Sequence, residues 1–432
     1  MKIKQIIMTS LLSCIMAMTF IACSDDDDNN NNNTKLPTLS PKEQWSATLK
    51  GDGEKLGAYP DLYCNYWEYT YEVNKNSDKI LCLKGEFPHC RYFSISLYND
   101  ETGDVFSGIN DQDISADNGS TNPFVKTTSG KNYFTLYVVP NETPQSVIDK
   151  LDSKNVVKVA AGVNKVAVVV RHYLGTTADG SKKDEYAGVE LPAITALNMN
   201  LESTDVPEHV TSNVYKITSK VFTQKSDENK EMPFFLAPIG RYYPNSFTSY
   251  LYGRTHLRED SVLTFSFIPA PVPTKPEEYK NAVTRYWSIC IGSASDTRSY
   301  MSVYDAKARY ADGKKATFVV CLKKNPKLSA IQSKVDEMNA NGEYVNLFVW
   351  DSERKNIDGK PIGEIVAIMY RNILPDRDWE HSIARMTPTN YKNDKGEDPI
   401  DQVTSPNDQL AHLALGDYGP LGVKVKNEDF LK

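Results

Sequence analysis

RYFSISL, at Arg91–Leu97, returns as RYWSICI at Arg285–Ile291. In both copies large apolar side chains alternate with tyrosine, serine or cysteine, which is the two-residue period of a β-strand. One face of each predicted strand is therefore apolar and headed by an arginine, and the other carries tyrosine and small side chains. Such a strand belongs to a sheet that buries one face in a hydrophobic core. Arg91 and Arg285 are predicted to be structural equivalents.

The segments around this pair also recur in one order. Each half continues with an apolar strand, a short helix that follows a proline (Pro144 or Pro326), and two further strands. The last strand reads VAVVVR in the first half and VAIMYR in the second, so Arg171 corresponds to Arg371. A series of similar segments in the same order indicates an internal duplication.

Strands dominate both halves, and turn residues separate them. This pattern predicts a mainly β protein with two duplicated antiparallel β-sandwich domains, jelly-roll-like, each with one short helix. The 432 residues are enough for two separate cores. The predicted organisation is a signal peptide (1–22), a tether (23–39), a first sandwich (40–175), a connecting segment (176–232), a second sandwich (233–390) and a C-terminal tail (391–432).

The N-terminus has the pattern of a secretory signal. Lys2 and Lys4 precede an apolar run that ends at Ala22. FIAC, which ends at Cys23, resembles the lipobox of bacterial lipoproteins, in which the cysteine is lipidated and becomes the first residue. We therefore predict lipidation at Cys23, with Cys14 after LLS as the alternative.

A polar run follows Cys23, with four aspartates and then five asparagines at 29–33. It cannot bury apolar surface, so it is typical of a disordered tether. An acidic run directly after the lipidated cysteine resembles the surface-export signal of Bacteroidetes lipoproteins. This resemblance implies an outer-membrane location, lipid-anchored and facing the cell exterior.

The composition narrows the choice of partners. The chain has 56 acidic against 49 basic residues, a net charge of −7, and the basic residues do not cluster. This balance argues against nucleic acid as a partner. The predicted partners are the membrane, through the N-terminal lipid, and a glycan or a cell-surface protein.

Five cysteines follow Cys23, which is an odd number outside the cytoplasm. Three of them lie within apolar strand patterns, where a free thiol acts as a small hydrophobic group. We predict buried free thiols, with a Cys82–Cys90 disulfide as the alternative.

Several motifs together resemble a known group of proteins. They are the repeated arginine strand, the Asn110–Phe124 loop, the strand end Arg171–Tyr173, and YRNILP at Tyr370–Pro375. The chain resembles a little-studied group of secreted bacterial β-sandwich proteins with domains of unknown function. The resemblance covers most of residues 60–390 and implies the fold, and it brings no catalytic residues with it.

An aromatic stripe is the first candidate ligand site. Trp67, Tyr69 and Tyr71 alternate along one predicted strand and so share one face. Exposed rings in a row can stack against sugar rings while polar neighbours orient the hydroxyl groups. The stripe therefore suggests a glycan-binding surface, and the alternative is that these rings fill the core.

An oxygen-rich loop is the candidate metal site. Asp111, Asp113, Ser115 and Asp117 place oxygen side chains at alternate positions, as a calcium ligand set requires. The loop departs from the EF-hand pattern because Ala116 stands where that pattern has glycine. The alternative is a loop held by Asx turns. We expect no cofactor, with calcium in this loop as the alternative.

The repeated arginines Arg91, Arg285, Arg171 and Arg371 admit two interpretations. A guanidinium can clamp a carboxylate or phosphate ligand. Alternatively, its stem covers the core and its head pairs with a carboxylate of the protein itself. The repetition at strand ends favours this structural role.

No catalytic motif of the common hydrolases, metalloproteases or nucleotide-binding enzymes is present in the sequence. The six histidines are scattered singly. The sequence therefore favours a non-catalytic surface lipoprotein that binds a glycan or similar ligand. The alternatives are a scaffold or adhesion protein with a protein partner, and a hydrolase whose site has no recognisable motif.

Overall fold

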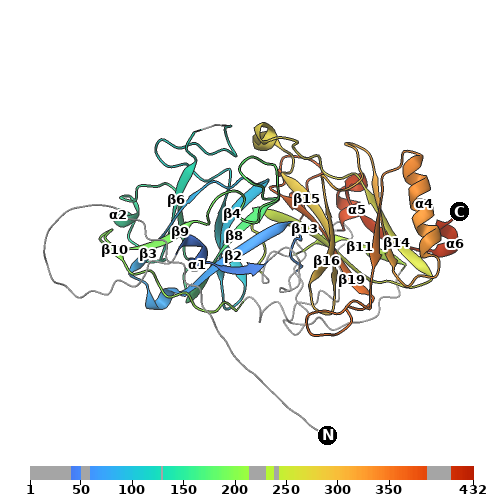
Figure 1. Cartoon of the computed structure of the whole chain (residues 1–432), viewed down its shortest axis with the longest axis horizontal. Helices are drawn as coiled ribbons and strands as arrows, with labels where there is room; N and C mark the ends of the chain where they lie inside the picture. The colour runs from blue at the N-terminus through green and yellow to red at the C-terminus, as the bar shows by residue number, and fades with distance from the viewer. Residues whose placement is uncertain (1–39, 50–58, 128–129, 214–229, 238–242, 387–409) are drawn as a thin grey trace, which may run out of the picture. The chain divides into compact units, whose positions relative to one another are not determined.

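The structure is a computed structural model, and its described residues form one compact unit (Figure 1). Cys23, the signal peptide and the tether lie outside the described residues. The described residues are 40–49, 59–127, 130–213, 230–237, 243–386 and 410–432.

The first sandwich consists of two five-stranded sheets, with strand orders β1-β2-β8-β4-β5 and β10-β9-β3-β6-β7. The strands are short and are joined by turns, as the sequence predicts. The elements are α1 (Pro41–Gln44), β1 (Ser46–Leu49), β2 (Cys64–Glu72), η1 (Val73–Lys75), β3 (Lys79–Glu86), β4 (Tyr92–Asn99), β5 (Asp104–Asn110), β6 (Tyr133–Val139), α2 (Gln145–Ile148), β7 (Val156–Lys158), β8 (Lys165–Tyr173), β9 (Ala193–Asn198) and β10 (Ser203–Thr204).

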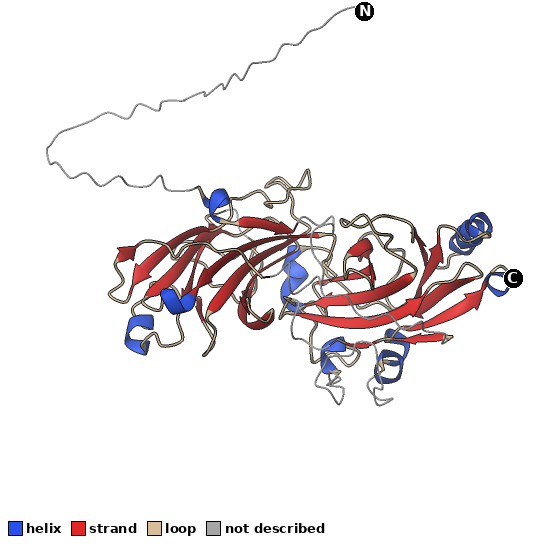
Figure 2. Cartoon of the chain, turned by 90° about the horizontal axis from the view of Figure 1, so that it is seen from below, coloured by secondary structure: helices blue, strands red, loops and turns tan. Residues whose placement is uncertain are grey.

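The second sandwich has two sheets of the same size, with orders β12-β13-β19-β15-β16 and β11-β20-β14-β17-β18. Figure 2 shows helices outside the strands near the C-terminus of this half. The elements are β11 (Glu231–Pro233), β12 (Phe235–Leu236), β13 (Thr248–His256), β14 (Ser261–Phe267), η2 (Pro276–Asn281), β15 (Tyr286–Ser293), β16 (Ser299–Tyr304), β17 (Ala316–Leu322), α4 (Leu328–Ala340), β18 (Val345–Trp350), β19 (Ile365–Ile373), η3 (Ile383–Arg385), α5 (Ala411–Ala414), η5 (Gly416–Tyr418), β20 (Leu421–Lys426) and α6 (Asn427–Phe430).

The two halves share strand order and register. Arg171 in β8 lies opposite Ser94 in β4, and Arg371 in β19 lies opposite Ser288 in β15. The mainly antiparallel β fold is confirmed, and each half adds one parallel pair, β6–β7 or β17–β18. A helix, α2 or α4, crosses between the two strands of each parallel pair, as a parallel connection requires. The duplication itself stays a prediction.

Both sandwiches extend beyond the predicted boundaries. Residues 193–204, which the sequence assigns to the connecting segment, form β9 and β10 of the second sheet. Residues 421–426, assigned to the tail, form β20 between β11 and β14. Both segments are short and stand among polar residues, so their alternation is weak, and pairing with longer strands holds them in place.

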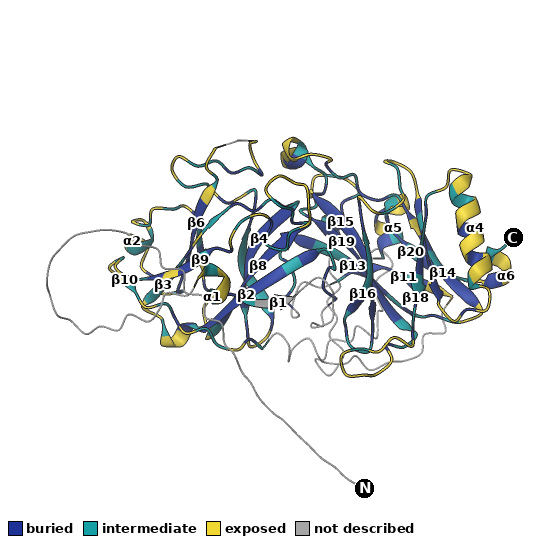
Figure 3. Ribbon diagram, in the orientation of Figure 1, coloured by how far each residue is buried: buried dark blue, intermediate teal, exposed yellow. Residues whose placement is uncertain are grey.

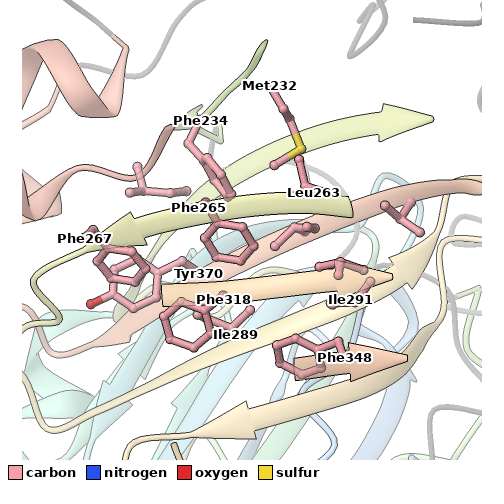
Figure 4. Packing of buried hydrophobic residues seen from close by; sticks show 14 of the residues in the cluster. Met232, Phe234, Leu263, Phe265, Phe267, Ile289, Ile291, Phe318, Phe348 and Tyr370 are labelled. Carbon is pink, nitrogen blue, oxygen red and sulfur yellow. The ribbon is translucent and has the colours of Figure 1, made fainter. Parts of the chain in front are cut away.

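Each sandwich buries a hydrophobic core between its two sheets. In the second sandwich the rings of Phe265 and Phe267 stack on Phe318, with centroid distances of 5.2 and 5.6 Å (Figure 4). Helix α4 covers the outer face of the same sheet with Ile331 and Val335, and its other face is exposed (Figure 3). The five cysteines at positions 64, 82, 90, 290 and 321 are free thiols, as predicted. Cys64, Cys290 and Cys321 are buried, whereas Cys82 and Cys90 are only partly buried, which corrects the prediction for these two.

The repeated strand is buried on both faces. Phe93, Ile95 and Leu97 of β4 point into the core of the first sandwich, as predicted. Tyr92 and Ser94 on the opposite face are also fully buried. This face contacts the second sandwich, because Tyr92, Tyr173 and Tyr286 belong to one buried cluster that joins the two halves.

Candidate functional site

The predicted glycan platform is part of the core, and that prediction is wrong. Trp67, Tyr69 and Tyr71 are only 3%, 3% and 1% exposed. The ring centroids of Trp67 and His172 are 4.9 Å apart, and those of Tyr69 and Trp45 are 6.3 Å apart. A sugar cannot stack on these rings because other side chains already cover them.

His172 is buried in the same core. It lies between Trp67 and Phe93, at centroid distances of 4.9 and 5.5 Å. Burial lowers the pKa of His172 to about 3, so the imidazole is neutral at physiological pH. His172 is therefore an uncharged residue of the packed core.

The oxygen-rich loop does not converge on a cation. Asp111 pairs with Arg285, Asp113 accepts a hydrogen bond from Asn110, and Asp117 accepts one from Thr135. Ser115 uses its backbone groups, which bond to the side chain of Asn155. Within the described ranges no three His, Cys, Asp or Glu side chains are placed to hold a metal ion. The loop does not fit calcium.

Asx turns hold this loop instead, as the alternative interpretation predicts. The Oδ1 atom of Asn110 accepts from the backbone N–H of Gln112, and that of Asn122 accepts from the N–H of Phe124. The amide of Asn122 also donates to the carbonyl of Asp111, at 2.6 Å. The loop is thus closed by its own asparagines.

Arg91 and Arg285 exchange their carboxylate partners between the two halves. Nη1 of Arg285 lies 3.2 Å from both carboxylate oxygens of Asp111 in the first half. Nη2 of Arg91 lies 3.4 Å from Oδ1 of Asp305 in the second half. Each arginine also donates to the backbone carbonyl of the other, at 3.1 and 3.3 Å. The exchanged pairs, as we call these contacts, join the two sandwiches.

The two aspartates occupy equivalent places. Each follows the last residue of a strand, β5 or β16, and accepts from the backbone N–H of the aromatic residue in the repeated motif, Phe93 or Trp287. Burial raises the pKa of Asp111 to about 6, although Arg285 opposes the shift, and burial also raises that of Asp305. Both carboxylates are engaged in ion pairs, which supports a structural role for Arg91 and Arg285 and gives no acid–base pair for a hydrolase.

Arg371 has a carboxylate partner and is buried, at 3% exposure. Its Nη1 lies 3.8 Å from Oδ2 of Asp61, and its guanidinium also donates to the backbone carbonyl of Tyr59. Asp61 in turn accepts from the hydroxyl of Ser288 at 2.6 Å and from that of Tyr286 at 3.0 Å. The segment 59–61 precedes β2 of the first half, so this contact also crosses between the halves.

Arg171 occupies the equivalent register position, and no carboxylate of the described residues lies within ion-pair distance of it. It is also 3% exposed, and its Nη2 donates to the carbonyl of Tyr243 at 2.9 Å. The residue that corresponds to Asp61 is Asn245, which follows Tyr243 and Pro244 as Asp61 follows Tyr59 and Pro60. Asn245 accepts from the hydroxyl of Tyr92, as Asp61 accepts from that of Tyr286. The two halves therefore differ in charge at equivalent positions.

A second aromatic group lies at the surface of the second sandwich. Trp379 stands perpendicular to Tyr418, with centroids 5.3 Å apart, and His381 stacks on Tyr418 at 3.9 Å. All three side chains are partly exposed. Exposed charged residues flank this aromatic cluster, with the side chains of Glu380 and Asp417 77% and 66% exposed. The sequence does not reveal the cluster because its rings come from segments about 40 residues apart, on either side of η3 and α5.

Comparison with known proteins identifies the chain with no family. No family model and no curated protein matches it. A crystal structure of an uncharacterized protein from Burkholderia cenocepacia is 9% identical with a TM-score of 0.46, and the match covers 88% of this chain and 81% of that one. A Vibrio parahaemolyticus protein is 9% identical with a TM-score of 0.37, over 75% of this chain and 87% of that one.

In the described part of the chain, no helix is long and apolar enough to span a bilayer.

Proposed function

We propose that this protein is a lipid-anchored protein of the outer-membrane surface that binds a glycan without catalysing a reaction. The observation that carries the proposal is the partly exposed aromatic cluster of Trp379, His381 and Tyr418. Its rings pack on one another and are partly exposed, in contrast to the buried rings of Trp67 and its neighbours.

The geometry of the cluster suits a sugar ring. The indole and the phenol meet edge to face at 89°, and both remain partly exposed. Stacking of a sugar on one ring contributes roughly 1 kcal/mol beyond the buried area. The exposed carboxylates of Glu380 and Asp417 are next to the rings in sequence and pair with His381 and Lys315. The second oxygen of each carboxylate can accept a hydrogen bond from a sugar hydroxyl.

With a lipid anchor, weak individual binding sites are enough to hold a polysaccharide at the membrane. If Cys23 carries the lipid, many copies share one membrane and can engage one polysaccharide at once. The second and later contacts are then intramolecular in effect, and the overall avidity exceeds that of one site by orders of magnitude. A single modest aromatic site is compatible with this arrangement.

Trp379→Ala should weaken polysaccharide binding by about tenfold or more, because it removes the partly exposed indole on which the sugar stacks. Retardation of the soluble protein in gels that contain single polysaccharides measures the effect. The matched control is Tyr133→Ala, which removes a ring that is 43% exposed at the start of β6. The Tm of both variants should stay within about 2 °C of the parent, since neither ring is in a core. Equal retardation of parent and Trp379→Ala by every polysaccharide that binds would refute this site.

Cys23→Ala should release the protein from the membrane fraction. The reason is that the thiol of Cys23 is the acceptor for the lipid, and the described helices offer no membrane span. Fractionation of cells that carry the variant, with protease shaving of intact parent cells, tests both the anchor and the orientation. Cys14→Ala is the control and should leave the protein in the membrane. Parent protein that resists shaving would contradict the outward orientation.

A further inference from the structure

The loop between β5 and β6 contains one of the two Asn-Gly pairs of the sequence, Asn118–Gly119. The backbone N–H of Ser120 donates to the carbonyl of Asp117 at 2.8 Å, so the pair occupies the two central positions of a β-turn. Gly119 has a φ of +77°, which glycine adopts without steric cost. Both residues of the pair are exposed, and a Cβ at Gly119 would meet no atom within 4 Å. The turn is therefore open to water and base.

The groups that react with each other in an Asn-Gly pair are unrestrained in this turn. Among the residues that the structure describes, no hydrogen bond engages the side-chain amide of Asn118 or the backbone N–H of Gly119. The second pair, Asn341–Gly342, is equally exposed but lies at the C-terminal end of α4. There the N–H of Gly342 donates to the carbonyl of Asn339 at 3.2 Å. The molecule thus contains its own reference pair, in which the backbone nitrogen is engaged.

The second half has an aspartate at the position of Asn118. Asp312–Gly313 and Asn118–Gly119 each lie the same number of residues after the carboxylate of an exchanged pair. The N–H of Lys314 donates to the carbonyl of Ala311 at 3.0 Å, which closes the same kind of turn, and its glycine has a φ of +69°. One turn geometry therefore accommodates asparagine in the first half and aspartate in the second.

We infer that Asn118 is a site of spontaneous deamidation. The backbone nitrogen of Gly119 gives its proton to base and attacks Cγ of Asn118, and ammonia leaves as the five-membered succinimide closes. Water then adds to one of the two ring carbonyls and opens the ring to aspartate or to isoaspartate. One ammonia is released and one water is consumed, so the step needs no oxidant, reductant or enzyme. Glycine favours the attack because it has no side chain to obstruct it and changes its backbone angles easily.

The two products differ in what they do to the turn. Aspartate leaves the backbone unchanged and gives the first half the side chain that the second half has at Asp312. Isoaspartate routes the chain through the side-chain carbon, which lengthens the backbone and disturbs the bond from Ser120 to Asp117. Each event adds one negative charge to a chain with a net charge of −7, so the modified protein separates on anion exchange. The reaction is independent of glycan binding.

Peptide mapping by mass spectrometry tests the inference while the soluble protein is incubated in mildly alkaline buffer. One sample reports the exchange of ammonia for water at both Asn-Gly pairs. Asn118 should convert about tenfold or more faster than Asn341, because the N–H of Gly342 must first leave its hydrogen bond. In concentrated urea the two pairs should convert at similar rates, since the fold no longer distinguishes them. An unmodified Asn118, or equal rates at the two pairs in the folded protein, would overturn the inference.

Two variants separate the effect of the turn from that of the sequence. Asp312→Asn places an Asn-Gly pair in the equivalent turn, and the new amide should convert at a rate similar to that of Asn118. Gly119→Ala should slow the conversion about tenfold or more, because the added Cβ obstructs the attack and disfavours a positive φ. A folded Asp312→Asn variant that stays unmodified would show that this turn does not promote the reaction, and would contradict the inference.

Discussion

Replacing Arg285 by methionine should lower the free energy of unfolding by about 3–5 kcal/mol, because it leaves the buried carboxylate of Asp111 without its cation. The loss should be smaller at pH 5 than at pH 8. Burial already raises the pKa of Asp111 to about 6, above its value in the unfolded chain, so protonation favours the folded state as the pH falls through 6. Urea unfolding at the two pH values measures both effects.

Two variants test whether the loss comes from the unpaired charge. The double variant Arg285→Met/Asp111→Leu removes both charges and should recover most of the stability, since an apolar pair can replace a buried ion pair. Arg91→Met at the equivalent position should cost less, because that side chain is 16% exposed and its pair is longer, at 3.4 Å. A double variant as unstable as the single one would show that packing, and not charge, dominates at Arg285.

Trp67→Ala should destabilise the first sandwich by about 3–5 kcal/mol, as expected when a buried aromatic ring is removed and leaves a cavity. The indole is 3% exposed and contacts His172 and Tyr186, so little of the void can fill with solvent. Thermal and urea unfolding measure the loss. Polysaccharide binding, measured at a temperature where the variant is folded, should be unchanged.

The control for this prediction is Tyr133→Ala, which should change stability by less than about 0.5 kcal/mol because the side chain is at the surface and outside the core. If Trp67→Ala keeps the parent stability and loses binding, the ring is accessible after all, and the proposed site at Trp379 falls with it.

The alternation of the repeated strand predicts its inner face because a period of two is set by local geometry. Phe93, Ile95 and Leu97 reach the core as expected. The same alternation cannot say what covers Tyr92 and Ser94, since that depends on a second sandwich far away in the sequence. The alternation of Trp67, Tyr69 and Tyr71 likewise shows that they share a face, and it is silent on whether that face is covered.

The candidate sites depend on contacts between residues far apart in the sequence, which no local sequence pattern predicts. Asp111 and Asp305 each end a strand in their own half, yet each pairs with an arginine of the other half. A comparison of the two halves would have suggested their equivalence, because both follow the hairpin of the repeated strand. The aromatic cluster joins Trp379 to Tyr418 across α5 and η3, and neither segment has a periodic pattern.

The exchanged pairs have the form of an isologous interface, in which residue i meets residue j and j of the partner meets i. That relation normally holds between two copies of one chain about a two-fold axis. Here one chain contains both sides, with Arg91 to Asp305 and Arg285 to Asp111 as the two reciprocal contacts. Such an interface lets the two sides diverge separately, which identical subunits cannot do. Asp61 in one half and Asn245 at the equivalent position of the other half are an example of such divergence.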